Sequence, residues 1–417
     1  MAMYALVDGV AFFSSCEEIF RPDLRNRGIV ILSNNDGTCV SLNEKAKELG
    51  LKKFKPYFEL KPLIDKHNIC VKSSNFALYG DLSKKMMNIL SSFASDSSIY
   101  SIDELFLCFS GHQQLREIGH KMNATVLAYT GLETRVGFGS NKTLCKVASV
   151  VAKRVKKANG VCCIDDDDQQ RKIILSRFPV EEVWGVGAKT AVKLNNLGVQ
   201  TALQLAEYDK DAIRAQFGIT IERTSRELNG QRCFNFHEDV SEQKQIVVSR
   251  SFGKPIYDLP ALQSVTISYL EKAMEKLRKN NQLVRHITVS ASTSRFSGGY
   301  NSIQNVITLP THSNDTLLAA TLVSRALEQC YRRHKYVRSM ICLTSLQANV
   351  HYQSDLLEPE QSDASRSLMK VVDTLNAGNQ KNIFLGRSPP ITEWSMKREF
   401  LSPEYTTRWP DLPRIKC

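Results

Sequence analysis

The feature that most constrains the fold is a pair of adjacent carboxylates inside an apolar segment. The segment runs from Ile99 to Phe109, with Asp103 and Glu104 in its middle. Apolar residues on both sides favour a buried strand, where two neighbouring carboxylates are costly unless a cation compensates them. Because neighbouring residues on a straight strand face opposite ways, the chain must turn near the acids if both serve one site.

Mg²⁺ is the simplest compensating cation, because it favours sites made of one or two carboxylates and substrate phosphates. A second candidate ligand, Asp8, ends the short apolar run that begins at Tyr4. Together the two segments suggest a metal site at the ends of two buried strands. An ordinary polar turn explains the adjacent pair equally well, so the pair alone leaves both interpretations open.

The charge balance indicates a polyanionic partner. The 417 residues, enough for two to four domains, include 55 Lys and Arg against 43 Asp and Glu, a formal net charge of +12. Nucleic acid is the first expectation and an anionic membrane surface the second. The chain has no apolar run of membrane-spanning length and no signal peptide, and its eleven cysteines include no C-x-x-C pair. We therefore expect a cytoplasmic protein without disulfides or a zinc site.

Apolar residues at helical spacing predict a helix from Asn141 to Lys157. Its polar positions include six cations and no acid, namely Lys142, Lys146, Lys153, Arg154, Lys156 and Lys157. Exposed helices usually mix charges of both signs to gain pairing. The unmixed face therefore favours phosphate contacts over simple solvation.

Periodicity predicts two small α/β units. From residue 4 the expected order is βαββαβ, a split βαβ sheet backed by helices, with an insertion of strands and a helix at 28–49. The same order repeats between residues 246 and 346, after a polar linker at 238–245. Beyond residue 350 the chain is polar and turn-rich, so we expect partial disorder there.

The segment Gly185-Val-Gly187, followed by Lys189, indicates two short helices around a glycine hairpin. It has neither the third glycine of a dinucleotide-binding fingerprint nor the G-K-[ST] of a P-loop. The glycines would let backbone N–H groups approach a phosphate at a helix start without reading sequence. The segment resembles the helix-hairpin-helix motif of DNA-repair and replication proteins; a plain turn between helices is the alternative.

Five segments together resemble the Y-family translesion DNA polymerases of the UmuC type, the catalytic subunit of bacterial DNA polymerase V. They are residues 33–37, 73–79, 100–104, 141–148 and 401–408. The resemblance covers nearly the whole chain and implies an α/β (α+β) right-hand polymerase with a split βαβ palm. It implies a palm at 1–24 and 76–168, small fingers at 25–75, a helical thumb with the helix-hairpin-helix at 169–240, a βαββαβ little finger at 241–349, and a C-terminal tail for clamp and partner docking at 350–417.

The resemblance also implies a catalytic centre. Asp8 and Asp103 would hold two Mg²⁺ ions, and Gly9 would offer its backbone carbonyl. Glu104 would complete the site of the ion that activates the primer 3′-hydroxyl. Two metals stabilise both the attacking and the leaving oxygens of an in-line displacement.

Further residues are implied for nucleotide, DNA and clamp binding. Phe13 would be the steric gate that excludes the ribose 2′-hydroxyl, with Phe12 beside it. The other implied contacts are Lys47 and Lys153 for the triphosphate, Gly185, Gly187, Lys189, Arg250, Arg285 and Arg332 for DNA, and Gln353, Leu356 and Leu357 for the sliding clamp. On pattern alone the clamp motif is weak, because five residues recur by chance.

The implied function is error-prone translesion synthesis in the SOS DNA-damage response, with primer-template DNA and deoxynucleoside triphosphates as substrates. The implied partners are a sliding clamp, a processed UmuD-type dimer and a RecA-type filament. The chain departs from the family pattern at Val10, Leu42, Glu44 and Lys45. These departures, mostly in the fingers, leave open a non-catalytic or weakly active DNA-binding regulatory paralogue. A cyclase-like enzyme on a similar palm would have no purpose for the hairpin or the second basic unit.

Overall fold

The chain forms two compact units. The computed structural model describes residues 3–164, 168–237, 243–295, 299–352, 361–377, 383–386, 394 and 396–412. The first unit comprises residues 1–33, 37–240 and 399–417, and the second comprises 34–36 and 241–398. Within the described residues, every helix is too short or too polar to cross a membrane.

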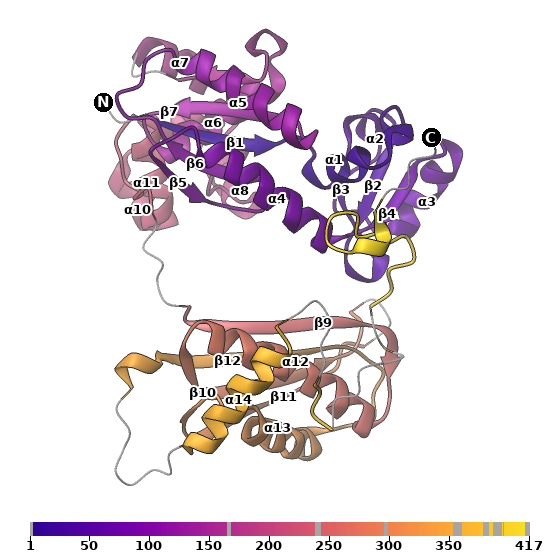
Figure 1. The fold of residues 1–417 in the computed structure, drawn as a ribbon. Coiled ribbons are helices and arrows are strands. Elements are labelled where there is room, and N and C mark those ends of the chain that lie inside the picture. Colours follow the sequence, from indigo (N-terminus) through magenta and orange to yellow (C-terminus); the bar gives the residue numbers. More distant parts are fainter. Residues whose placement is uncertain are drawn as a thin grey trace. The chain divides into compact units, whose positions relative to one another are not determined.

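A five-stranded sheet is the core of the first unit, with β1 (Tyr4–Gly9) at its centre (Figure 1). Its order is β5-β6-β1-β7-β8, and only the pair β7 and β8 is parallel. The other strands are β5 (Asp96–Ile99), β6 (Glu104–Cys108), β7 (Thr134–Gly139) and β8 (Val161–Cys163). The segment 99–109, expected as one strand with a turn near the two acids, instead contains the last residue of β5, a turn at residues 100–103 and the whole of β6. The turn near the two acids is therefore present in a β5–β6 hairpin.

Helices cover both faces of this sheet because its strands are apolar on both sides. One face packs against α1 (Phe12–Ile19), α4 (Phe76–Ser91) and α5 (Leu115–Thr130). The other face receives α6 (Lys142–Arg154), the predicted basic helix. Gly137 and Gly139 on β7 let the α6 backbone lie directly on the strand, since a Cβ at either position would overlap it.

The insertion forms a small sheet of its own, in the order β3-β2-β4. Its elements are β2 (Ile29–Leu32), β3 (Cys39–Leu42), α2 (Glu44–Glu48), α3 (Tyr57–Lys66) and β4 (Cys70–Ser73). No prediction covered α3 or β4. Helix α3 has a proline inside it and buries only Leu60 and Ile64, so its apolar signal is weak.

A helical segment follows β8 and is attached to α6 by a buried carboxylate. Glu227 accepts hydrogen bonds from the Thr143 amide (2.9 Å) and hydroxyl (2.7 Å) at the start of α6. The Asn141 side chain donates to the Glu227 carbonyl at 2.8 Å. The helices are α7 (Asp168–Ser176), α8 (Ala188–Asn196), α9 (Ala202–Glu207), α10 (Lys210–Phe217) and α11 (Ile219–Leu228).

The second unit has the predicted βαββαβ order. Its four strands form an antiparallel sheet in the order β11-β10-β12-β9, and α12 and α13 pack on one face (Figure 1). The elements are β9 (Gln245–Ile256), α12 (Leu259–Lys279), β10 (Gln282–Ser292), β11 (Ser302–Ser313), α13 (Thr316–Cys330) and β12 (Tyr336–Ala348).

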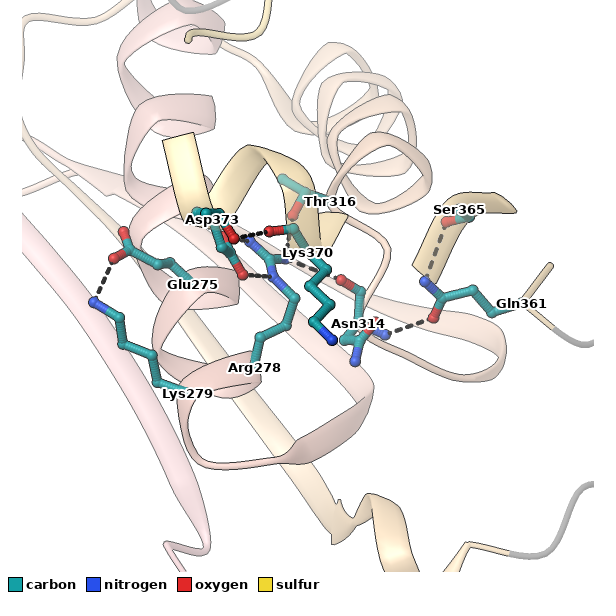
Figure 2. A network of polar contacts seen from close by, with 10 residues as sticks. Glu275, Arg278, Lys279, Asn314, Thr316, Gln361, Ser365, Lys370 and Asp373 are labelled. Atoms are coloured by element: carbon teal, nitrogen blue, oxygen red, sulfur yellow. Dashed lines mark hydrogen bonds and ion pairs between the residues drawn. The ribbon is translucent and has the colours of Figure 1, made fainter. Parts of the chain in front are cut away.

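The described part of the chain beyond residue 350 contains a helix and a segment with specific contacts. Helix α14 (Asp363–Leu375) packs on the second unit, where Arg278 makes a bidentate ion pair with Asp373 at 2.6 and 2.7 Å (Figure 2). The same guanidinium donates to the Thr316 hydroxyl at 2.7 Å. Residues 399–412 pack on the first unit instead. Specific long-range contacts order these segments, which local composition does not reveal.

Candidate active site

The β5–β6 hairpin and β1 bring the three predicted carboxylates together. Glu104 opens β6 directly opposite Asp8 on β1 in the antiparallel register. Asp103 precedes it in the hairpin turn, and its carbonyl accepts a hydrogen bond from the Gly9 amide at 2.9 Å. Thus one end of the sheet carries Asp8, Gly9, Asp103 and Glu104.

These carboxylates line a single cavity of about 360 Å³. Phe12, Phe13 and Lys153, all predicted from the sequence, line it as well. The remaining lining residues are Gly9, Ala11, Val40, Ser41 and Lys53. The cavity therefore combines acidic, basic and aromatic walls, which suits a charged ligand with a planar part.

Two lysines one heptad apart on α6 reach two of the acids. Lys146 forms an ion pair with Glu104 at 2.7 Å, and Lys153 pairs with Asp8. Burial raises the pKa of Asp8 to about 6, and Lys153 opposes part of that rise. The sequence suggested that a buried carboxylate here would need a cation. In this structure Lys153 of α6 is the cation beside Asp8.

Ser101 holds the adjacent acids in the turn. Its hydroxyl donates to one Asp103 carboxylate oxygen at 2.7 Å and lies 3.4 Å from a Glu104 oxygen. Asp103 is half-buried and points into the same cavity.

The donor set fits Mg²⁺, because the cavity offers several carboxylate oxygens, the hard ligands that this ion prefers. Among the described residues, however, no three Asp, Glu, His or Cys side chains converge closely enough to bind a metal as they stand. In this structure Lys146 and Lys153 pair with Glu104 and Asp8. Each lysine contacts one oxygen of its partner carboxylate, Lys146 the Oε1 of Glu104 and Lys153 the Oδ2 of Asp8.

A chain of contacts runs from Glu104 to the glycine hairpin. The Lys146 ammonium lies 4.0 Å from the centre of the Tyr100 ring. The Tyr100 hydroxyl accepts a hydrogen bond from the Trp184 indole at 2.9 Å. Trp184 immediately precedes Gly185, so the hairpin and the acidic cluster share one network.

The predicted glycine hairpin is present in altered form. Gly185 has a φ of +90°, a conformation that favours glycine, and Gly187 is the residue before α8. The element before the hairpin is a single 3₁₀ turn, Val180–Glu182, instead of a full helix. Lys189 is exposed in the first turn of α8.

The small sheet contributes a different lysine from the one predicted. Lys47 is exposed, pairs with Glu44 at 2.9 Å and is outside the cavity lining. Lys53 lines the cavity together with Val40 and Ser41. The backbone amide of Phe54 donates to the Cys39 carbonyl at 2.7 Å, which brings Lys53 alongside β3. The only local signal was the lysine cluster around residues 45–53.

The three arginines predicted in the second unit lie in different surroundings. Arg250 pairs in register with Ser339, whose hydroxyl contacts Thr266 of α12, so Arg250 lies on the helix-covered face. Arg285 lies at a register shift of β10, and Arg332 is exposed after α13. Arg338, one of the basic residues of the second unit but not a predicted DNA contact, is exposed and donates to Ser249 at 2.8 Å on the opposite face. The clamp residues Gln353, Leu356 and Leu357 lie outside the described residues.

The fold matches known polymerases. A solved Y-family DNA polymerase chimera superposes with a TM-score of 0.64 at 21% identity, covering 82% of this chain and 98% of the chimera. This match shows that the chain has the fold of the Y-family DNA polymerases. The predicted right-hand polymerase fold is therefore confirmed.

Sequence comparison identifies the family within the Y-family DNA polymerase fold. Residues 7–150 match the impB/mucB/samB family, residues 243–356 match the C-terminal domain of that family, and residues 366–415 match a domain of unknown function. The chain is 38% identical to protein SamB of Salmonella typhimurium over 99% of this chain and all of SamB. It is 37% identical to protein UmuC of Salmonella typhimurium strain LT2, over 99% of this chain and 100% of that protein. The chain belongs to the impB/mucB/samB family.

Proposed function

We propose that this chain is an error-prone translesion DNA polymerase that adds deoxynucleotides to a primer 3′-hydroxyl by two-metal-ion catalysis. One observation supports this most directly. Asp8, Asp103 and Glu104 line the same cavity as the basic residue Lys153 and the aromatic residue Phe13. Carboxylates for metal, a cation for triphosphate and a ring for the sugar are the parts that nucleotidyl transfer needs.

The acidic residues would hold two Mg²⁺ ions. Asp8 and Asp103 would contact both ions, Glu104 would serve the ion at the primer hydroxyl, and Gly9 would offer its carbonyl. When bound, the ions lower the pKa of the attacking hydroxyl and neutralise charge on the phosphates. The hydrogen bond from Ser101 would keep the Asp103 carboxylate oriented in the turn.

The incoming nucleotide would lie between α6 and the small sheet. Lys153, once released from Asp8, would contact the triphosphate, and Lys53 and Ser41 would contribute from the other wall. Lys47 would take part only after leaving Glu44. Phe13, with Phe12 behind it, would close the cavity against a ribose 2′-hydroxyl.

We assign the parts of the right hand as the resemblance implies. The palm would be residues 1–24 and 76–168, the fingers 25–75, the thumb 169–240, the little finger 241–349 and the tail 350–417. DNA would contact Gly185, Gly187 and Lys189 through the phosphate backbone, and Arg285 and Arg332 in the little finger. Arg338 suits this role better than Arg250, because Arg338 is exposed on the face away from α12.

We also propose a cytoplasmic role in the SOS response. Residues 353–357 would bind the sliding clamp, and a processed UmuD-type dimer and a RecA-type filament would be the other partners. The family membership supports these proposals, and the basic charge of +12 supports the DNA partner.

Primer extension tests the proposal. With Mg²⁺, primer-template and deoxynucleotides, the parent chain should extend primers and Asp103→Ala should lose that activity. The exposed Asp65 on α3 provides a control, because Asp65→Ala removes a carboxylate that is not part of the cavity lining. Circular dichroism should show both variants folded. Normal extension by Asp103→Ala would refute the site assignment.

A second candidate function is a DNA-binding regulatory paralogue without turnover. The departures from the family pattern at Leu42, Glu44 and Lys45 favour it, as does the pairing of Lys47 with Glu44 at 2.9 Å. Its signature would be salt-sensitive DNA binding with no extension, even with clamp and UmuD-type partner supplied.

A further inference from the structure

The C-terminal segment 399–412 contacts both β4 of the small sheet and the end of α1, which packs on the five-stranded sheet. The Ser73 amide donates to the Phe400 carbonyl at 3.1 Å, and the Phe400 amide donates back to the Ser73 hydroxyl at 3.1 Å. The Tyr405 ring stacks on Phe20 with a centroid separation of 4.7 Å. The segment is thus bonded to β4 and stacked on the end of α1.

Its most buried member, Ser402, enters a polar cluster beneath the cavity. The Ser402 hydroxyl donates to Glu17 Oε1 at 2.9 Å, and the Asn75 amide donates to the Ser402 hydroxyl at 3.0 Å. The Tyr79 hydroxyl donates to the same Glu17 oxygen at 2.8 Å. All four residues are at most 3% exposed.

Glu17 depends on these two hydroxyl donors. Its other carboxylate oxygen is buried and has no hydrogen-bond partner among the described residues. Burial raises the pKa of Glu17, and the bonds from Tyr79 and Ser402 oppose that rise. A carboxylate in this state is sensitive to the loss of either donor, because an unsatisfied buried acceptor is costly.

Tyr79 carries the connection to the cavity. Its ring stacks on Phe13 with centroids 4.8 Å apart and planes 16° apart, while Phe76 meets Phe13 edge-on. Phe13 lines the cavity beside the carboxylates. Three contacts therefore lead from Ser402 through Glu17 and Tyr79 to Phe13.

We infer that the C-terminal segment positions the proposed steric gate, Phe13. Ser402 acts through Glu17 and Tyr79 to fix the position of the Phe13 ring. The inference rests on the proposed function, since it assigns Phe13 the discrimination between deoxyribose and ribose. It gives residues 400–405, part of the domain of unknown function, a role in substrate selection. Ser402, Glu17 and Tyr79 are positioning residues, because none of them lines the cavity.

The test compares nucleotide selectivity, the ratio of kcat/KM for a deoxynucleotide to kcat/KM for the matching ribonucleotide. Ser402→Ala should lower this ratio about three- to tenfold, because it removes a hydrogen bond to a buried carboxylate. Thr407→Ala is the matched control: its hydroxyl contacts Glu404 within the segment and nothing in the cluster. Ser402→Thr, which keeps the hydroxyl, should retain most of the selectivity of the parent chain.

Tyr79→Phe provides a second route. It keeps the ring on Phe13 and removes only the bond to Glu17, so the ratio should also fall. Because both hydroxyls act on one carboxylate, the double variant with Ser402→Ala should fall less than the product of the single effects. Equal losses of kcat/KM for both nucleotides, at an unchanged ratio, would mean that the segment only stabilises the fold and would overturn the inference.

The inference and the proposed function fail in different ways. If Phe13→Ala lowers the ratio and Ser402→Ala does not, only the inference is overturned. If Phe13→Ala leaves the ratio unchanged, the gate assignment and the inference both fall. A readout without turnover is the ¹⁹F resonance of 4-fluorophenylalanine at position 13. It should shift in Ser402→Ala but stay in place in Thr407→Ala, and an unshifted resonance in both contradicts the coupling.

Discussion

At the scale of single residues, the candidate active site contains two ion pairs between lysines of α6 and carboxylates of the sheet. The sequence predicted carboxylates for metal and lysines for phosphate, and the structure brings both kinds of side chain to one cavity. Without a ligand, each kind satisfies the other, as Lys146 does with Glu104. Such pairing lowers the cost of buried charge, and ligands must compete with it.

Lys146→Gln should strengthen divalent metal binding in the absence of DNA. The substitution removes the ammonium that holds Glu104 at 2.7 Å, so the carboxylate becomes available. We expect the affinity for Mn²⁺ to rise about tenfold, which electron paramagnetic resonance of the free ion measures.

Lys121→Gln, at an exposed position of α5, controls for the loss of one positive charge. An unchanged Mn²⁺ affinity in Lys146→Gln would show that the ion pair does not compete with metal.

At the scale of elements, the position of α6 decides the site. The helix carries Lys146 and Lys153, and it reaches the carboxylates because β7 has glycine where it lies closest. The hairpin supplies Asp103 and Glu104 from the opposite edge of β1. Helix α6, strand β1 and the β5–β6 hairpin are separate in the sequence, and they form one site only because they pack together.

Gly137→Ala should destabilise the chain by about 3 kcal/mol, because the new Cβ would overlap the α6 backbone at Ser149 and Cys145. Gly80→Ala is the matched control on α4, where a Cβ meets nothing within 4 Å. That variant should stabilise the chain by about 0.5–1 kcal/mol, since alanine favours helix interiors. Denaturant unfolding measures both, and equal midpoints would contradict the close packing of α6.

Helix α14 offers a second prediction at this scale. Asp373→Ala breaks the bidentate pair with Arg278, whose side chain is 12% exposed, and should weaken the docking of α14 by about 1–3 kcal/mol (Figure 2). Hydrogen exchange should accelerate in α14 while the β9–β12 sheet stays protected. Asp363→Ala, whose carboxylate is 98% exposed, should leave exchange in the middle of α14 nearly unchanged. Equal acceleration in both variants would contradict the anchoring role of Arg278.

At the scale of the whole molecule, the net charge of +12 predicts DNA binding that weakens as salt rises. Arg338→Gln should weaken duplex binding several-fold and reduce the salt slope by about 1, since a phosphate contact is lost. Arg250→Gln, on the helix-covered face, should change the slope less. Fluorescence anisotropy over a salt series gives both slopes. A larger change of the salt slope in Arg250→Gln than in Arg338→Gln would mean that DNA binds the helix-covered face instead.

Several parts of the fold were predictable because their signals are local. The helix predicted at 141–157 and the βαββαβ order of the second unit depend on the period of apolar residues. The structure has the second-unit order and most of the helix, which ends at Arg154 and is followed by a 3₁₀ turn at Lys156–Ala158. The segment 99–109 required a turn, and the hairpin provides it. By contrast, the positions of α14 and of the segment 399–412 depend on partners far away in the sequence, so no local pattern predicted where they pack.

By itself, the sequence determined the βαββαβ order of the second unit, the candidate acids Asp8, Asp103 and Glu104, and the family to which the chain belongs. Those properties follow from neighbouring residues and short motifs. The tertiary structure alone decided that Lys53 lines the cavity instead of Lys47, and that two α6 lysines hold the acids. It also joined Ser402 to Glu17 across 385 residues. Such contacts depend on long-range packing, and no local pattern encodes which side chains will share a buried charge.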